Sequence, residues 1–301
     1  MEKSKKGLGI IYLLIAIVFF STFEVMNKII FETSGVEIGP QQINFLRFFF
    51  GGLLLIVILI FKKDFKISLK NLLLCGLLGV LVVAISMAFI QFALAAKDSK
   101  ASIVAVIFSS NPVFVFTICA LMGKEKLTAK KGIGIIIGFI GVIVVFLEQL
   151  DVTALLKTSS IFALVSAISY ALYTVFGREL MREVGSLKMN AYSFTLGSLA
   201  LIPIVLIRGE PLFTVHPSII PHIGYLVVFV TCIAYVAYFQ GLGILGAGMG
   251  SLTFFLKPVL ASIIAFIVLK DPITLNLVIG TILILSGIAL ATINIKTKAK
   301  S

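Results

Sequence analysis

The chain contains a series of long apolar stretches separated by short polar connections. A helix that crosses a bilayer needs roughly 20 mainly apolar residues, and ten stretches of this kind occur along the sequence. They lie at residues 8–30, 41–61, 71–94, 99–122, 131–149, 158–178, 189–208, 218–241, 246–269 and 274–295. Within lipid every backbone polar group must be satisfied by the protein, so these stretches are expected to be helices and not strands. The sequence therefore predicts an all-α polytopic membrane protein with ten transmembrane helices.

The composition agrees with burial in lipid. Of the 301 residues, 60% are hydrophobic and 13% are charged, whereas a soluble domain has about 25% charged residues. The net charge of +12 comes from Lys and Arg in the connections, which indicates topology and contact with the lipid bilayer; nucleic acid is not an expected partner. The cysteines are scattered within apolar stretches, so we expect no disulfide framework, no metal site and no cofactor.

The distribution of Lys and Arg predicts the orientation of the chain. If the N-terminus is cytoplasmic, the inside connections hold 17 of these residues and the outside connections hold 5. Short cytoplasmic connections are enriched in Lys and Arg, so both termini are predicted to lie in the cytoplasm. We expect a multi-pass protein of the plasma membrane.

The two halves of the chain resemble each other at an offset of 146 residues. This offset pairs Pro112 with Pro258, Glu125 with Asp271, Thr128 with Thr274, Gly134 with Gly280, and Gly141 with Gly287. Chance similarity between apolar helices explains matches of Leu, Ile and Val, but not this set. Because each half holds five helices, the second half must enter the membrane in the opposite orientation. We therefore predict two inverted-topology repeats, over residues 1–150 and 151–301.

The repeated stretches resemble the EamA family of the drug/metabolite transporter superfamily. The similarity rests on NPVF, GKEKLT and GIGIIIGFIG in the first half and, more loosely, on KPVL, LKDPIT and GTILILSG in the second. It covers nearly the whole chain in two copies, and Asp271-Pro272 is the one departure, with little effect on the fold. The resemblance implies ten helices and movement of a small-molecule solute by alternating access, most often export. It names no substrate, because the family's solutes include amino acids, sugars, nucleotides and drugs.

Lys257 stands near the centre of the stretch 246–269, directly before Pro258. Proline interrupts helical hydrogen bonding, and membrane helices tolerate such a break where the backbone lines a cavity. The repeat places Asn111 and Pro112 at the same depth, and two interrupted helices near the midplane are typical of a transport site. Lys257 and Asn111 are therefore predicted to bind the solute, with Pro112 and Pro258 as helix breaks. The alternative for Lys257 is a structural ion pair with a carboxylate.

Three further ionisable residues lie inside apolar stretches, and one of them, Lys28, is near the outer interface and is expected to extend its ammonium group toward it. Either Arg47 binds a carboxylate or phosphate of the solute in bidentate fashion, or it is neutralised by Glu24. Glu24 is the one acidic residue deep in any stretch. Burial and a nearby cation affect the protonation of a carboxylate in opposite directions, so Glu24 is a candidate for proton coupling. A static salt bridge with Lys257 or Arg47 is the alternative.

Tyrosines and glycines give weaker signals. Four tyrosines recur along the sixth and eighth stretches and either pack within the protein or stack on an organic solute: Tyr170, Tyr173, Tyr235 and Tyr238. Gly134, Gly138 and Gly141 recur at helical spacing, which favours close helix packing within the repeat or between the protomers of a homodimer.

The preferred interpretation is a secondary transporter, acting as an exporter, of small organic metabolites such as amino acids. An intramembrane lipid-processing enzyme is an alternative, but the sequence has no HExxH motif and no paired carboxylates in its apolar stretches. A channel is another alternative. Channels build rings of identical groups by oligomer symmetry, and a single central lysine does not indicate such a ring. We therefore expect the chain not to be an enzyme.

Overall fold

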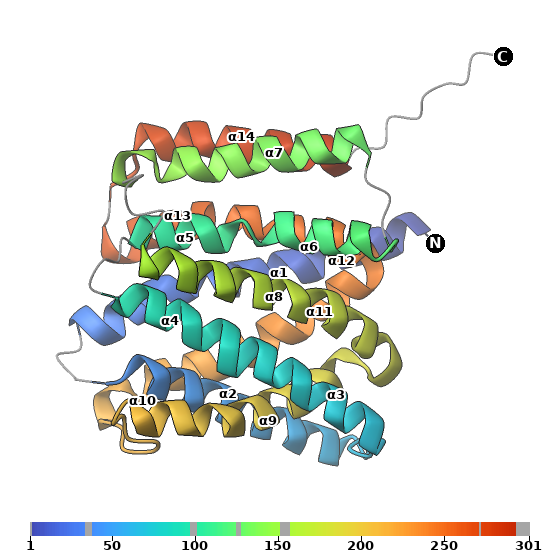
Figure 1. Cartoon of the computed structure of the whole chain (residues 1–301), viewed down its shortest axis with the longest axis vertical. Coiled ribbons are helices and arrows are strands. Elements are labelled where there is room, and N and C mark those ends of the chain that lie inside the picture. The colour runs from blue at the N-terminus through green and yellow to red at the C-terminus, as the bar shows by residue number, and fades with distance from the viewer. Residues whose placement is uncertain are drawn as a thin grey trace.

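A computed structural model describes residues 2–33, 38–96, 101–124, 128–150, 157–270 and 272–292. Over these ranges the chain is helical, and its long helices run side by side (Figure 1). Nine helical segments of the described part are long and apolar enough to cross a membrane. The remaining predicted span is α7 (Ala129–Val145), which is apolar but has only 17 residues. The predicted fold class, an all-helical membrane protein of ten helices in two repeats, is confirmed.

The elements follow the repeat. In the first half they are α1 (Glu2–Lys28), η1 (Ile29–Thr33), α2 (Pro40–Phe61), α3 (Leu69–Gly79), η2 (Val80–Met87), α4 (Ala88–Ala95), α5 (Ala101–Ser109), α6 (Asn111–Leu121), α7 and η3 (Leu147–Gln149). In the second half they are α8 (Thr158–Val184), α9 (Ser186–Ile207), η5 (Pro217–Ile219), α10 (Ile220–Tyr225), η6 (Leu226–Ile233), α11 (Ala234–Leu245), α12 (Ala247–Ser251), η7 (Leu252–Leu256), α13 (Lys257–Leu269) and α14 (Leu275–Thr292).

Irregularities of the helices recur at the offset of the sequence repeat. The third span of each half contains a π-helical stretch of eight residues, and these stretches begin at Val80 and Leu226, which are 146 residues apart. The fourth span of each half is also broken, and its second part begins at Asn111 in one half and at Lys257 in the other. The two halves therefore share their backbone irregularities as well as their residue pattern.

The paired threonines begin the last helix of each repeat. The Thr128 hydroxyl accepts a hydrogen bond from the backbone N–H of Lys131 at 3.3 Å, and the Thr274 hydroxyl accepts one from that of Leu277 at 3.2 Å. A side-chain oxygen in this position satisfies an N–H group that has no partner within the helix. The Thr pair found in the sequence is thus a pair of equivalent helix caps.

Two pairs of equivalent helices mark the ends of the molecule. Helices α7 and α14 lie together at one end of the long axis, and α2 and α9 lie together at the other (Figure 1). Gly134, Gly138 and Gly141 of α7 all approach groups within the chain, and a Cβ on Gly138 would lie 2.8 Å from the ring of Phe255. The groups nearest to these three glycines all belong to the second repeat. The stripe therefore packs between the two repeats, and not within one repeat as the sequence suggested.

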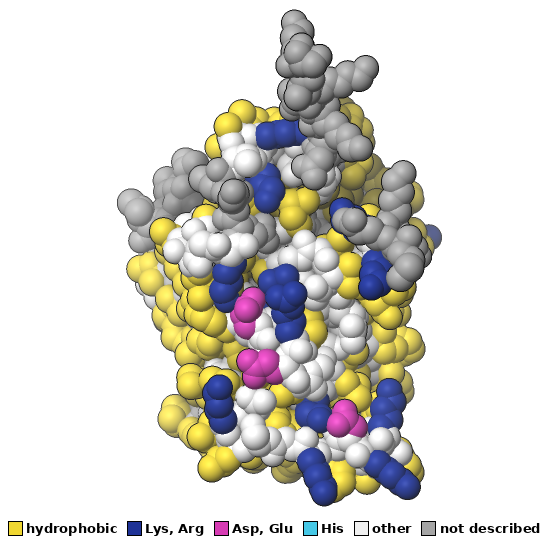
Figure 2. Space-filling view, turned by 90° about the vertical axis from the view of Figure 1, so that its right-hand side faces the viewer, with side chains coloured by type: hydrophobic (Ala, Val, Ile, Leu, Met, Phe, Trp, Pro, Cys, Tyr) yellow, Lys and Arg dark blue, Asp and Glu magenta, His cyan; other side chains and the backbone are white. Residues whose placement is uncertain are grey.

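Lys and Arg side chains gather on one end of the helix bundle. Figure 2 looks onto the side of the molecule at which α1 begins and shows these side chains across a face that is rimmed by hydrophobic surface. We name this end the basic face. The helix ends and connections on this side of the bundle contain Lys62, Lys66, Lys124, Arg182 and Lys188. Many large hydrophobic side chains on the flanks of the bundle are exposed, as expected for surface that contacts lipid.

Candidate functional site

A cavity with a volume of ≈ 540 Å³ lies between the two repeats. Both halves contribute to its wall, through α1, α2, α4 and α5 from the first and through α8, η6, α11, η7 and α13 from the second. It extends from Tyr170 and Tyr235, midway along their spans, to Phe31, Leu94 and Leu269 at helix ends remote from the basic face. Small-molecule sites have volumes of about 300–1,000 Å³, so the cavity has the size of a site for an organic solute.

Lys257 begins α13 and lines the cavity together with Pro258. The preceding residues, Leu252–Leu256, form a 3₁₀ turn, so the backbone changes its helical register directly before the lysine. Proline is tolerated in the first turn of a helix, because its missing N–H would have no intrahelical acceptor there. Lys257 Nζ lies 5.4 Å from the ring centre of Phe108 on α5, within cation–π range. The break in the ninth span thus presents an ammonium group to the cavity.

Arg47 lines the same cavity from α2. It is 2% exposed, and its guanidinium carbon lies 4.4 Å from the ring centres of both Phe23 and Phe48. Its Nη2 lies 3.8 Å from the sulfur of Met87. Contacts with two aromatic rings favour a cation at this place and fix the position of its planar set of donors.

Two side-chain amides on α2, close in sequence to Arg47, bond to the backbone of the third span. The Asn44 side-chain amide donates to the carbonyl of Met87 at 3.0 Å, and that of Gln41 donates to the carbonyl of Ala88 at 3.0 Å. Both acceptors lie where the π-helical η2 passes into α4. A π-helical stretch shifts the backbone hydrogen-bond register and is frequent at functional sites. These bonds join α2 to the third span directly beside the cavity.

Aromatic side chains form the inner part of the cavity wall. Tyr170 packs against Phe254 with ring centres 5.4 Å apart, and Tyr235 packs against Phe20 at 4.8 Å. Both pairs have the edge-to-face arrangement that aromatic rings prefer. Tyr170 and Tyr235 are thus held by rings that line the cavity themselves.

The other two predicted tyrosines lie outside the cavity wall. Tyr173 is fully buried, and its hydroxyl donates to the side-chain oxygen of Asn190 at 2.9 Å. Tyr238 is 1% exposed and packs against Phe254, whose ring centre is 5.3 Å away. Both therefore pack behind the residues that line the cavity.

Asn111 and Pro112 occupy the place in the first repeat that Lys257 and Pro258 occupy in the second, but they do not line the cavity. Asn111 is fully buried, and its amide donates to the carbonyl of Ala167 on α8 at 3.2 Å. The side chains at the two equivalent helix breaks thus have different surroundings. One side chain is hydrogen-bonded to a neighbouring helix, and the other lines the cavity.

The first span supplies a further polar part of the wall. Asn27 and Lys28 line the cavity. Glu24 belongs to the same helix, but its side chain lies outside the part of the chain that the structure describes.

Several wall residues carry no signal in the sequence. Phe20, Phe23, Phe108 and Phe254 line the cavity, but each is an apolar residue in an apolar stretch. They differ from other apolar residues only because they lie on the side of their helix that faces the other repeat. Which side this is depends on how the ten helices pack.

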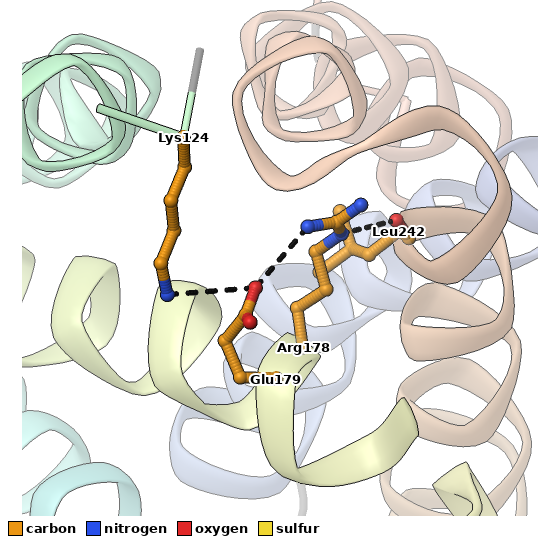
Figure 3. A network of polar contacts seen from close by, with 4 residues as sticks. All are labelled: Lys124, Arg178, Glu179 and Leu242. Atoms are coloured by element: carbon orange, nitrogen blue, oxygen red, sulfur yellow. Dashed lines mark hydrogen bonds and ion pairs between the residues drawn. The ribbon is translucent and has the colours of Figure 1, made fainter. Parts of the chain in front are cut away.

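At the basic face a polar network connects the two repeats (Figure 3). Arg178 on α8 donates from Nε to the carbonyl of Leu242 on α11 at 2.9 Å, and its Nη1 lies 3.2 Å from the Glu179 carboxylate. Lys124, which follows α6, reaches the same carboxylate oxygen at 3.5 Å. The network therefore joins the end of α6 in the first repeat to α8 and α11 in the second. In the sequence Lys124 and Arg178 contribute to the predicted orientation of the chain, and Glu179 carries no signal.

The fold and cavity define a membrane transport protein built from two inverted five-helix repeats. The EamA-like transporter family matches the chain twice, over residues 7–147 and 157–293. The chain therefore belongs to the EamA-like transporter family, and it is a transporter and not an enzyme.

Two proteins with similar sequences are named as transporters. The chain is 30% identical to an uncharacterized transporter of Clostridium kluyveri, over 93% of this chain and 91% of that protein. It is 25% identical to the uncharacterized inner membrane transporter YicL of Salmonella typhimurium, over the full length of both. A crystal structure with 18% identity superposes with a TM-score of 0.78, covering 97% of this chain and 98% of the other, and shows the same fold.

Proposed function

We propose that the protein is a secondary transporter that exports small organic metabolites, such as amino acids, by alternating access. The observation that carries this proposal is the contrast between the two ends of the repeat interface. The cavity extends along the interface to the helix ends remote from the basic face, whereas at the basic face Lys124, Arg178 and Glu179 join the repeats. A transporter of inverted repeats works by rocking one half against the other around a central site.

We place the basic face in the cytoplasm and the protein in the plasma membrane. The excess of Lys and Arg in the predicted inside connections supports this orientation, and a full-length relative is named an inner membrane transporter. In this orientation the cavity faces the outside, and the described conformation is the outward-facing one. Release of an exported solute takes place from this conformation.

In this proposal the residues have separate roles. Lys257, Arg47, Tyr170 and Tyr235 contact the solute, because they line the cavity. The moving halves are residues 1–150 and 151–301, with Pro112 and Pro258 as their helix breaks. Asn111, Tyr173 and Tyr238 position the cavity wall from behind. Glu24 is the proposed site of proton coupling. A homodimer stays a prediction, since the glycine stripe of α7 is used within the chain.

Solute efflux from liposomes tests the proposal. Purified protein is reconstituted into liposomes loaded with a panel of radiolabelled amino acids, organic acids, sugars and nucleotides, with and without a proton gradient. We expect at least one solute to leave faster than from protein-free liposomes, with saturation at high concentration. The proposal fails if no solute shows protein-dependent efflux or exchange. Ohmic single-channel currents would instead favour a channel.

A further inference from the structure

We propose that the transported solute is an organic anion with an apolar body, and that Arg47 and Lys257 bind its anionic group. This inference rests on the proposed transport function and names the chemical class of its substrate. It follows from the charge, the lining and the size of the cavity.

The wall of the cavity is positively charged. Three of its residues, Lys28, Arg47 and Lys257, are cationic, and none of the described wall residues is acidic. The adjoining part of the first span contains two acidic residues, Glu24 and Glu32. Even if both are counted against the three cations, a positive excess remains, whatever contacts the cations make within the chain. In a cleft with low-dielectric walls such an excess attracts anions and disfavours cations.

Two of these cations are suited to binding an anionic group of the solute. Arg47 is buried between Phe23 and Phe48, which fix the guanidinium, and its planar set of donors matches a carboxylate or a phosphate in bidentate fashion. Lys257 adds a point charge from the opposite repeat, at the helix break. An anion bound by both side chains would contact both repeats, which would allow its binding to affect their relative position.

The remaining wall favours an apolar body. Phenylalanine, tyrosine and aliphatic side chains make up most of the lining, and the described uncharged polar residues apart from the tyrosines are Asn27, Gln91, Ser109 and Ser262. A sugar or nucleotide would bury many hydroxyl and amide groups here with few partners, which is unfavourable. The volume of ≈ 540 Å³ is also far larger than an inorganic anion needs. An aromatic or branched aliphatic carboxylate or phosphate ester fits both parts of the wall.

A matched set of ligands tests the charge preference. The probes are 3-phenylpropionate, its neutral amide 3-phenylpropionamide, the cation 3-phenylpropylamine, and inorganic phosphate, each titrated against the purified full chain by calorimetry. A charge-assisted bidentate contact is worth enough to separate the carboxylate from the amide by at least about tenfold in Kd. We expect the carboxylate to bind best, and phosphate, which lacks the apolar body, to bind more weakly. Equal binding of carboxylate and amide, tighter binding of the amine, or binding of neither the carboxylate nor an aromatic phosphate ester overturns the inference. A second pair, benzyl phosphate and benzyl alcohol, tells phosphate recognition from carboxylate recognition.

Variants assign the preference to the predicted cations. Lys257→Met is expected to weaken carboxylate binding about tenfold and to leave amide binding unchanged, whereas Lys257→Arg retains the preference. Lys66→Met, at an exposed position on the basic face, is the matched control and should bind both probes as the wild type does. If both Lys257→Met and Arg47→Gln still prefer the carboxylate over the amide as the wild type does, these two residues do not bind the anionic group. If Lys257→Met does not fold, the binding of carboxylate and amide by the wild type and by Lys257→Arg still tests the anion preference.

The outcomes separate this inference from the proposed function. Protein-dependent efflux of a neutral or cationic solute, without any anion preference, overturns the anionic substrate and leaves the transporter. A clear carboxylate preference without efflux of any solute overturns the transporter and leaves an anion-binding site.

Discussion

Gly134 of α7 lies against Gly287 of α14, so closely that a Cβ on Gly134 would fall 2.6 Å from the Gly287 carbonyl oxygen. The same approach occurs between Gly141 and Gly280, where a Cβ on Gly141 would fall 2.8 Å from the carbonyl oxygen. At the 146-residue offset Gly134 corresponds to Gly280 and Gly141 to Gly287. Each contact is therefore the image of the other, which is the pattern that a two-fold relation between two units produces.

This helix crossing predicts the effect of adding one methyl group. In Gly287→Ala the new Cβ would lie 2.4 Å from the backbone nitrogen of Gly138, and backbone atoms cannot move aside as a flexible side chain can. We expect a loss of about 1–3 kcal/mol in stability, measured as a lower midpoint of thermal unfolding in detergent.

The control is Gly132→Ala at the start of α7, where a Cβ has no neighbour within 4 Å. Alanine is favoured over glycine in a helix by roughly 0.5–1 kcal/mol, so this variant should unfold at the same or a higher temperature. Equal midpoints for Gly287→Ala and wild type would contradict the tight crossing.

Most of the fold is predictable from the sequence, because lipid imposes length and polarity on each helix. The predicted stretches 41–61 and 274–295 correspond closely to α2 and α14. Differences arise where helices continue past the apolar stretch. Helix α8 reaches Val184 and α11 reaches Leu245, and each ends at a glycine of positive φ, Gly185 at 85° and Gly246 at 95°. In α8 the added residues include Glu179, Arg182 and Glu183, polar residues that continue a helix without extending its apolar pattern.

The network at the basic face predicts how strongly the repeats are held together there. Glu179→Gln removes the carboxylate that Lys124 and Arg178 share. Partly exposed ion pairs contribute up to about 1 kcal/mol. We therefore expect the equilibrium constant for separation of the repeats at the basic face to increase by a few-fold. Cys119 on α6 is 2% exposed, and its alkylation by N-ethylmaleimide, followed by mass spectrometry, reports the opening.

Asp64→Asn is the matched control for this measurement. It breaks the pair of Asp64 with Lys188, whose atoms lie 2.7 Å apart on the same face, but it leaves the network between α6, α8 and α11 intact. Cys119 in this variant should react at the wild-type rate. An equal increase in both variants, or no increase in Glu179→Gln, would show that the network does not hold the basic face closed.

Coupling to protons predicts the behaviour of Glu24→Gln. Glutamine cannot release a proton, so transport by this variant should lose its dependence on pH while the protein keeps its thermal stability. The measurement is the initial efflux rate from liposomes between pH 5.5 and 8.5. Glu148→Gln, at an exposed position following α7, should keep the wild-type profile. A strongly destabilised Glu24→Gln protein would point to a structural salt bridge instead.

The site is less predictable from the sequence than the fold. Ionisable residues in apolar stretches stand out because they are unfavourable in lipid, and this marks Arg47 and Lys257, both of which line the cavity. The repeat marks Asn111 equally, yet its amide is bonded to α8. Pseudosymmetry relates positions in the backbone, but it does not show which of two equivalent side chains faces the cavity. That depends on how the helices pack against each other.

The central claim is that the solute passes through the cavity between the repeats, and obstruction of that cavity tests it most directly. Ala261 on α13 lines the cavity, whereas Ile282 on α14 is exposed on the flank of the bundle. Efflux of a transported solute is measured for Ala261→Trp and Ile282→Trp in matched liposomes. We predict that Ala261→Trp releases the solute no faster than protein-free liposomes, and that Ile282→Trp releases it at the wild-type rate. Wild-type efflux by a folded Ala261→Trp protein would contradict the account.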